Sequence, residues 1–305
     1  EQDPFMGYRG RPHAAASTGI DVIEHNEDGF RDDRSLRDLA RIEPRKTILC
    51  VGESSTYGLA AGRNTDTYPA VLERELRAVS SNQDWLVYNA GLPGYRTHEV
   101  VSLLNLRLLK VRPDYVVAMD LRNDFFAMRH LDEELDFNQY ILPLAQRSRT
   151  MLNEVLMQSS LFAFVASRWR MAFGDDLGGV VPAPGGVDPT PRGLRLYENG
   201  LAMMELLTSS AGASLIFVDQ PVDESRLKAG EASGLNAYRT ALSHFCTARR
   251  IPLLEAHALM DWNGLEPQDD VHLGTLGYAR LAKLLAPQIL RIDALRAPHR
   301  PALTQ

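Results

Sequence analysis

Four short segments of the chain bring together hydroxyl, amide, carboxylate and imidazole groups. They are 52–56 (GESST), 89–94 (NAGLPG), 121–124 (LRND) and 269–272 (DDVH). A serine hydroxyl becomes a nucleophile when a base takes its proton, and histidine is the side chain suited to that task near neutral pH. A carboxylate on the other side of the imidazole selects its tautomer. These residue types predict attack of a serine on a carbonyl or similar centre.

The elements that must position these segments are strands alternating with helices. Five strands are predicted from apolar runs at 47–51, 85–88, 115–119, 214–218 and 251–254. Runs that are apolar throughout are typical of a parallel sheet covered on both faces. Helices are predicted from residues spaced by three or four at 66–79, 97–108, 194–210, 235–245 and 275–289.

This alternation predicts an α/β fold, a flavodoxin-like three-layer α/β/α sandwich around a parallel five-stranded sheet with right-handed crossovers. In such sheets, ligands bind at the carboxyl ends of the strands. Three of the reactive segments directly follow predicted strands, and the fourth, after the fifth strand, precedes the last helix. We therefore expect all four to meet at one edge of the sheet.

The rest of the chain divides around this pattern. Residues 1–45 are rich in Gly, Pro, His and charge, and we interpret them as an N-terminal arm packed on a domain at 46–297. An insertion at about 125–195 carries Leu, Phe and Met and then a Gly/Pro-rich loop. It lies beside the predicted site and is the candidate for setting specificity, either by helix packing or as a lid over an acyl pocket. Residues 298–305 form a C-terminal tail.

Composition and charge exclude several classes of function. The net charge of −6, without a basic patch, gives no reason to expect binding to nucleic acid. The two cysteines form no CxxC pair and no histidine has a partner at ligand spacing, so we expect no metal site. No glycine-rich loop matches a nucleotide fingerprint, so no cofactor is expected. No run of about 18 apolar residues predicts a membrane span.

The four segments, in this order and spacing, resemble the blocks of the SGNH/GDSL hydrolase superfamily. Those blocks are Gly-Asp-Ser near the N-terminus, a Gly after the second strand, Gly-x-Asn-Asp after the third, and Asp-x-x-His near the C-terminus. The resemblance covers residues 46–290 and implies the SGNH hydrolase fold and a serine esterase. Two positions depart from it. Glu53 stands in place of Asp, and Leu121 in place of Gly, where a turn suited to Gly would be strained.

The resemblance also implies roles for individual residues. Ser54 would be the nucleophile, His272 the general base and then the general acid, and Asp269 the group that orients the imidazole. The N–H of Ser54, the N–H of Gly91 and the amide of Asn123 would form an oxyanion hole. Each such donor is worth about 2.7–4 kcal/mol when measured by removal. Glycine admits close backbone approach, and asparagine offers an uncharged NH₂ donor.

The neighbours of these residues have simpler interpretations. Glu53 and Arg122 are weaker candidates for contacts with substrate, and for Arg122 a surface ion pair is the favoured interpretation. Asp124 suits a cap on the helix that follows it, and Asp270 a solvent-facing position. In the arm, residues 26–31 (NEDGFR) resemble an Asn-x-x-Gly-Phe-Arg segment of bacterial SGNH proteins that often carry an anchor or signal. This favours a bacterial extracytoplasmic protein. The alternative is a polar turn that packs its Phe on the sheet.

Three functions remain open. The first is hydrolysis of short acyl, acetyl-sugar or lipid esters, or of thioesters, through an acyl-serine intermediate. The second is acyl transfer to a carbohydrate hydroxyl by the same groups, which water exclusion by the insertion would favour. The third is a non-catalytic module that binds carbohydrate or lipid on a hydrolase scaffold. The oligomeric state is not predicted.

Overall fold

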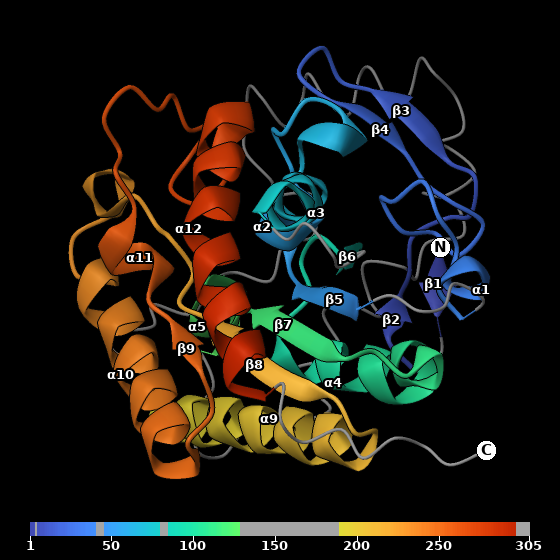
Figure 1. Ribbon diagram of the computed structural model, residues 1–305. Helices are drawn as coiled ribbons and strands as arrows, with labels where there is room; N and C mark the ends of the chain where they lie inside the picture. Colours follow the sequence, from blue (N-terminus) through green and yellow to red (C-terminus); the bar gives the residue numbers. More distant parts are fainter. Residues whose placement is uncertain (4, 41–45, 80–84, 129–188, 297–305) are drawn as a thin grey trace.

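A parallel sheet forms the centre of the computed structural model, which describes residues 1–3, 5–40, 46–79, 85–128 and 189–296. The strand order is β6-β5-β7-β8-β9, and every neighbouring pair is parallel. The five strands are β5 (Lys46–Gly52), β6 (Trp85–Gly91), β7 (Tyr115–Met119), β8 (Ser214–Val218) and β9 (Leu253–Leu254). The predicted five-stranded α/β/α sandwich is confirmed (Figure 1).

The last strand is shorter than the apolar run at 251–254 predicted. The N–H of Ile251 donates to Cys246 O at the end of the preceding helix instead of joining the sheet. Pro252 has no N–H to donate, although its carbonyl accepts from Phe217. Strand pairing therefore starts only at Leu253.

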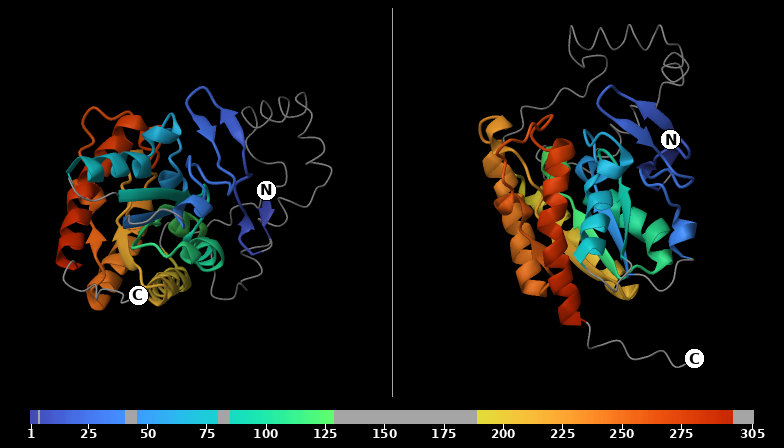
Figure 2. Two further views of the ribbon diagram at one scale, coloured as in Figure 1. Left: turned by 45° about the vertical axis from the view of Figure 1, so that its right-hand side comes forward. Right: turned by 45° about the horizontal axis from the view of Figure 1, so that its top comes forward.

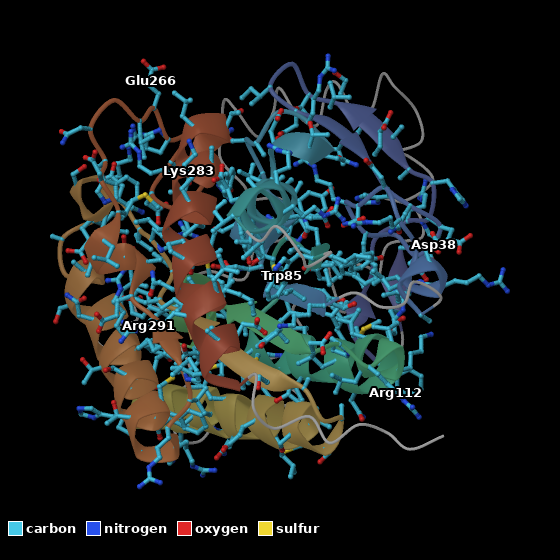
Figure 3. The ribbon with its side chains drawn as sticks, in the orientation of Figure 1. Asp38, Trp85, Arg112, Glu266, Lys283 and Arg291 are labelled. Carbon is cyan, nitrogen blue, oxygen red and sulfur yellow. The ribbon has the colours of Figure 1, made fainter. Side chains whose placement is uncertain are left out.

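One face of the sheet is covered by α3 (Tyr68–Val79) and α12 (Gly274–Arg296), which lie side by side, with α11 (Ala256–Leu259) beside them. Their buried side chains pack on the residues of β5 and β6 that face this layer, including Trp85, which is fully buried. Figure 3 shows Trp85 in the middle of the molecule, whereas Lys283 and Arg291 lie on α12. This layer matches the predicted helices at 66–79 and 275–289.

The opposite face is covered by α4 (Thr97–Leu103), α9 (Pro191–Ser210) and α10 (Glu231–Arg249), with the short helices α1 (Leu36–Leu39) and α5 (Arg122–Met128). Figures 1 and 2 show α9 running beneath the sheet, opposite α12. Helix α4 continues through a π turn and a 3₁₀ turn to Val111, and it ends at Arg112, whose φ is 52°. The helix predicted at 97–108 therefore runs on to Val111 and stops before Pro113, as expected for a proline stop.

The N-terminal arm is more ordered than its composition predicted. It forms two antiparallel hairpins, β1 (Gln2–Asp3) with β2 (Gly7–Tyr8) and β3 (Ala15–Ser17) with β4 (Val22–Glu24). Phe30 is fully buried, with its ring edge-on to Tyr88 of β6. The guanidinium of Arg31 is buried and donates to the carbonyls of Gly58 and Gly62. The arm thus contributes to the core and holds the loop at 58–62, which follows segment 52–56.

The predicted insertion at 125–195 lies mostly, at 129–188, outside the described residues, and so does the predicted tail at 298–305.

Candidate active site

Ser54 is the first residue of a four-residue helix, α2 (Ser54–Tyr57), that starts directly after β5. The turn before it depends on Gly52, whose φ is +147°. A Cβ at this position would lie 2.3 Å from the carbonyl oxygen of Met119 in the neighbouring strand, so a larger residue would push β5 and β7 apart. The side chain of Ser54 is held at the carboxyl edge of the sheet, with 8% of the residue exposed.

His272 and Asp269 reach Ser54 from the other end of the chain. His272 Nε2 lies 2.8 Å from Ser54 Oγ, and His272 Nδ1 lies 2.6 Å from Asp269 Oδ2. The other carboxylate oxygen of Asp269 accepts the backbone N–H groups of Val271 and His272, at 2.9 and 2.8 Å. One carboxylate thus shapes the loop and orients the ring. The structure brings together the three residues that the family resemblance had singled out.

The electrostatics of Asp269 suit this orienting role. Burial works to raise its pKa, but the hydrogen bonds from the His272 ring and from the backbone of Val271 and His272 outweigh it. The pKa of Asp269 is therefore held well below its ordinary value. The carboxylate stays ionised at neutral pH, where it favours the tautomer that presents an unprotonated Nε2 to the serine and stabilises an imidazolium.

Asn123 lies at the start of α5, close to the loop that follows β6. Its Nδ2 donates to Tyr95 O at 3.0 Å, and its backbone N–H donates to Glu53 Oε2 at 3.2 Å. One proton of the amide therefore remains to point elsewhere. The strain expected at Leu121 is absent. Among the described residues, positive φ at non-glycine positions occurs only at His13, Ala60, Arg112 and Arg250, and the Leu121 side chain is fully buried in the core.

The prediction for Gly91 needs correction. Its N–H donates to Asn89 Oδ1 at 3.1 Å and is not available to an oxyanion. Its lack of a side chain serves packing, because a Cβ would lie 2.2 Å from the backbone nitrogen of Tyr57 in α2. Three residues later, Gly94 has a φ of +78°, and its N–H has no acceptor among the described residues. The same loop thus offers a different glycine.

The arm supports this loop directly. Tyr8 Oη donates to the carbonyl of Pro93, Tyr95 Oη donates back to Tyr8 O at 2.6 Å, and the two rings pack edge to face. Since Tyr95 O in turn accepts from Asn123, a hairpin near the N-terminus supports the segment against which Asn123 rests.

The two weaker candidates for substrate contacts are used inside the protein instead. Glu53 is 1% exposed, and both of its oxygens accept hydrogen bonds, from Asn123 N and from Gln220 Nε2. Burial raises the pKa of Glu53 to about 8. Arg122 forms a two-point ion pair with Asp270, with Nη2 2.8 Å from Oδ1, and its guanidinium lies over the Phe126 ring. Asp270 is therefore buried and paired, not solvent-facing as predicted.

Asp124 caps a helix, but not the one that follows it. Its carboxylate accepts the backbone N–H and the hydroxyl of Thr97, at 3.0 and 2.9 Å, and so closes the N-terminus of α4. Burial raises the pKa of Asp124 to about 6. Burial also raises the pKa of Asp120 well above its usual range, and neither oxygen of that carboxyl has a hydrogen-bond partner among the described residues. Buried carboxyl groups thus collect beneath the site.

Gln220 is a site residue that sequence reasoning missed. It follows β8 by two residues, is fully buried, and contacts Glu53, Ser55 and Arg122 through its amide. The available signal was positional. The strand at 214–218 was predicted, and its carboxyl end was the one strand end from which no residue was proposed.

Within the described ranges, no three His, Cys, Asp or Glu side chains are grouped so that they would hold a metal ion. No helix in the same ranges is long and apolar enough to cross a membrane.

A serine, an imidazole and a carboxylate in hydrogen-bonded sequence, at the carboxyl edge of a covered parallel sheet, define the serine hydrolases of the α/β/α sandwich class. The model of the GDSL-like Lipase/Acylhydrolase family matches residues 50–280, and the chain belongs to that family. It is an enzyme, an SGNH/GDSL-type serine carboxylic ester hydrolase. A sequence comparison with curated proteins found no match.

Solved structures share the fold at low sequence identity. A lipase/acylhydrolase from Enterococcus faecalis superposes with a TM-score of 0.51 at 16% identity, covering 80% of this chain and 95% of the other. An acetylxylan esterase from Geobacillus stearothermophilus, Axe2 in its S15A form, gives 0.52 at 17%, covering 82% and 96%. TesA gives 0.52 at 14%, covering 81% and 99%.

Proposed function

We propose that this enzyme cleaves carboxylic esters through an acyl-serine intermediate, with Ser54 as nucleophile, His272 as base and acid, and Asp269 as the orienting carboxylate. The observation that carries the proposal is the unbroken relay from Asp269 Oδ2 through His272 to Ser54 Oγ, at 2.6 and 2.8 Å. A site that had lost catalysis would be expected to lack a member or its geometry, so the relay supports catalysis over a purely binding role.

The reaction follows from these contacts. Ser54 Oγ forms a bond to the ester carbonyl carbon while its proton passes to His272 Nε2. The tetrahedral intermediate then collapses, the bond to the alcohol oxygen breaks, and the imidazolium returns the proton to the departing alcohol. Water attacks the acyl-serine with His272 again as base, and the second collapse releases the acid and regenerates Ser54. Asp269 stays ionised throughout and stabilises the imidazolium.

The oxyanion would be held by the N–H of Ser54, the Nδ2 of Asn123 and the N–H of Gly94. Ser54 begins a helix, so its N–H has no intrahelical acceptor. Gly94 replaces Gly91 in this proposal because the N–H of Gly91 donates to Asn89, whereas the N–H of Gly94 has no acceptor among the described residues. Its neighbour Tyr95 accepts from Asn123, which supports placing the two donors in one hole.

The substrate class is narrowed by chemistry and similarity together. One structural relative is described as an acetylxylan esterase, which supports acetylated sugars as the first esters to test beside simple acyl esters. We also propose that the chain consists of an arm at 1–45, a catalytic domain at 46–297 and a tail at 298–305. Within the domain, the insertion at about 125–195 would set the specificity for the acyl group. Acyl transfer to a sugar hydroxyl uses the same acyl-enzyme and is an outcome of the same test.

The test is hydrolysis of p-nitrophenyl esters of increasing acyl length and of acetylated xylo-oligosaccharides, with and without an acceptor sugar. We expect hydrolysis by the wild-type protein and its loss in Ser54→Ala. The matched control is Ser102→Ala, because the hydroxyl of Ser102 bonds only the carbonyl of His98 in its own helix. Mass spectrometry of the protein trapped with substrate should place the acyl group on Ser54. Unchanged hydrolysis in Ser54→Ala, or a folded wild-type protein inert to all these esters, would refute the proposal.

A further inference from the structure

We propose that Gln220 is a positioning residue for the oxyanion hole, and that its amide holds the loop carrying Asn123 against the turn carrying Ser54. The inference rests on the proposed function for its catalytic consequence. Its structural part stands on contacts alone. Gln220 follows β8 by two residues, and neither a proposed triad member nor a proposed oxyanion donor comes from that strand end.

The amide of Gln220 is fully engaged and fully buried. Nε2 donates to Glu53 Oε1 and, at 3.0 Å, to Ser55 Oγ, while Oε1 accepts the backbone N–H of Arg122 at 3.0 Å. Glutamine offers two donors and an acceptor without charge, and all three capacities are used here. Glu53 and Ser55 flank the nucleophile, so Gln220 contacts both neighbours of Ser54.

Glu53 completes the connection to the oxyanion loop. Its Oε2 accepts the backbone N–H of Asn123 at 3.2 Å, while Gln220 accepts that of Arg122. These consecutive N–H groups belong to the first turn of α5 and have no intrahelical acceptor. The Glu53–Gln220 pair satisfies both and thereby fixes the backbone from which the Asn123 amide projects.

A third connection runs to the loop at 269–272, which carries His272. Ser55 Oγ, which accepts from Gln220, donates to the carbonyl of Val271 at 3.3 Å, and Val271 precedes His272. The Gln220 amide therefore links the nucleophile turn, the oxyanion loop and, through one hydroxyl, the base.

Gln220 is itself held from behind. Arg239 of α10 donates to Gln220 O at 3.4 Å and pairs with the adjacent Asp219 at 3.1 Å. The amide thus projects from an anchored backbone, and the position of the oxyanion loop depends on β8 and α10 as well as on its own strand. A buried network of this kind is rigid when every member is satisfied, and loss of one member leaves the others unpaired.

The first test compares Gln220→Ala with wild type by hydrogen exchange of the peptide spanning 120–126 and by ester kinetics. We expect faster exchange at residues 122 and 123. We also expect kcat to fall about tenfold to a hundredfold with KM changed less than about twofold, since an oxyanion donor acts mainly in the transition state. Gln288→Ala is the matched control, because Gln288 bonds only its own helix.

A double-mutant comparison then asks whether Gln220 acts through Asn123. In an Asn123→Ala background, Gln220→Ala should cost little further kcat, because the donor that it positions is already gone. An equal fold-loss with and without Asn123 would overturn the proposal, and so would unchanged exchange at 120–126 in Gln220→Ala.

A donor–acceptor exchange keeps the test decisive where the alanine variant fails to fold. In Glu53→Gln/Gln220→Glu, the new amide at position 53 donates to the new carboxylate at position 220, and both retain an oxygen for the N–H groups of Asn123 and Arg122. We expect the double variant to have a higher kcat and slower hydrogen exchange at 120–126 than Gln220→Glu alone. Absence of any recovery would count against the proposal. If the wild type cleaves no ester, hydrogen exchange at 120–126 still shows whether Gln220 holds this segment. Failure of the proposed function can therefore be distinguished from failure of the role proposed for Gln220.

Discussion

The guanidinium of Arg122 pairs with the carboxylate of Asp270 across the site, with Nη2 2.8 Å from Oδ1. Arg122 adjoins Asn123, and Asp270 adjoins Asp269, so this one ion pair joins the segment that carries Asn123 to the loop that carries His272. Its partners are 26% and 11% exposed as side chains. The pair is therefore less screened by solvent than a surface salt bridge, and its desolvation cost is lower than that of a fully buried pair.

We expect Asp270→Ala to lower kcat about tenfold, which corresponds to about 1.4 kcal/mol in the barrier, because the histidine loop loses its fixed partner. Stopped-flow or steady-state ester kinetics measure this. Asp261→Ala is the control, since the pair between Asp261 and Arg280 is more exposed on both sides. Equal effects of the two substitutions would show that the Arg122–Asp270 pair has no particular role.

Asn123→Ala should lower kcat by about 10²–10³-fold with little change in KM, because the amide stabilises charge that develops only in the transition state. Steady-state kinetics on the best ester found give both parameters. Asn263→Ala, which removes an exposed asparagine, should leave them unchanged. A rise in KM without a fall in kcat would assign Asn123 to substrate binding instead.

Asp269→Asn should leave the fold intact and lower kcat by about 10⁴-fold, because an amide in place of the carboxylate favours the wrong imidazole tautomer. Circular dichroism verifies the fold, and ester kinetics give the rate. Glu266 lies on the same loop at the edge of the molecule (Figure 3), so Glu266→Gln is the control and should leave kcat unchanged. Full activity in Asp269→Asn would remove Asp269 from the relay.

The buried carboxyl groups should make the folded protein less stable as the pH rises, the opposite of what carboxylates in ion pairs do. The pKa of Glu53 is raised by burial from an ordinary value near 4.5 to about 8, and burial raises that of Asp124 to about 6. At a pH between the pKa of the group in the unfolded chain and its pKa in the folded protein, the folded protein binds a proton that the unfolded chain releases. The free energy of unfolding therefore falls as pH rises, by up to about 1.4 kcal/mol per pH unit for each group inside its window.

Urea denaturation at half-unit steps from pH 5 to pH 8.5 measures this slope. Glu53→Gln should reduce the slope throughout pH 5 to 8, because the Glu53 window covers that range, and leave below pH 6 the part to which Asp124 contributes. Glu198→Gln, on the exposed surface of α9, should change neither part. A slope that is the same in Glu53→Gln and wild type would show that Glu53 has no raised pKa in the folded state.

Much of this architecture was readable from the sequence because it has a periodic signal. Uninterrupted apolar runs predicted all five strands, and four-residue spacing predicted α3, α4, α9, α10 and α12. The Asp269–His272 spacing placed both groups on one loop. These features depend on local pattern and on the rule that parallel strands share a carboxyl edge.

What escaped prediction depends on contacts between distant side chains. Nothing in the sequence around Asp124 indicates that its carboxylate caps α4 instead of the helix in which it lies. The choice between Gly91 and Gly94 depends on whether Asn89 takes the N–H of Gly91, and that is a packing outcome. The Arg122–Asp270 pair and the Gln220 amide likewise connect residues that are between 98 and 167 positions apart, where no spacing rule applies.

The Ser54–His272 contact spans 218 residues of chain and has a consequence for synthesis on the ribosome. The nucleophile is translated and can be folded into its turn long before its base exists. On the mechanism proposed above, a nascent chain that has not yet released 269–272 lacks the imidazole of His272 that would deprotonate Ser54, and we expect it to be inert toward esters. On the same mechanism, the chain becomes reactive toward esters only when 269–272 and α12, which directly follows, have joined the fold, so reactivity would appear at the end of translation.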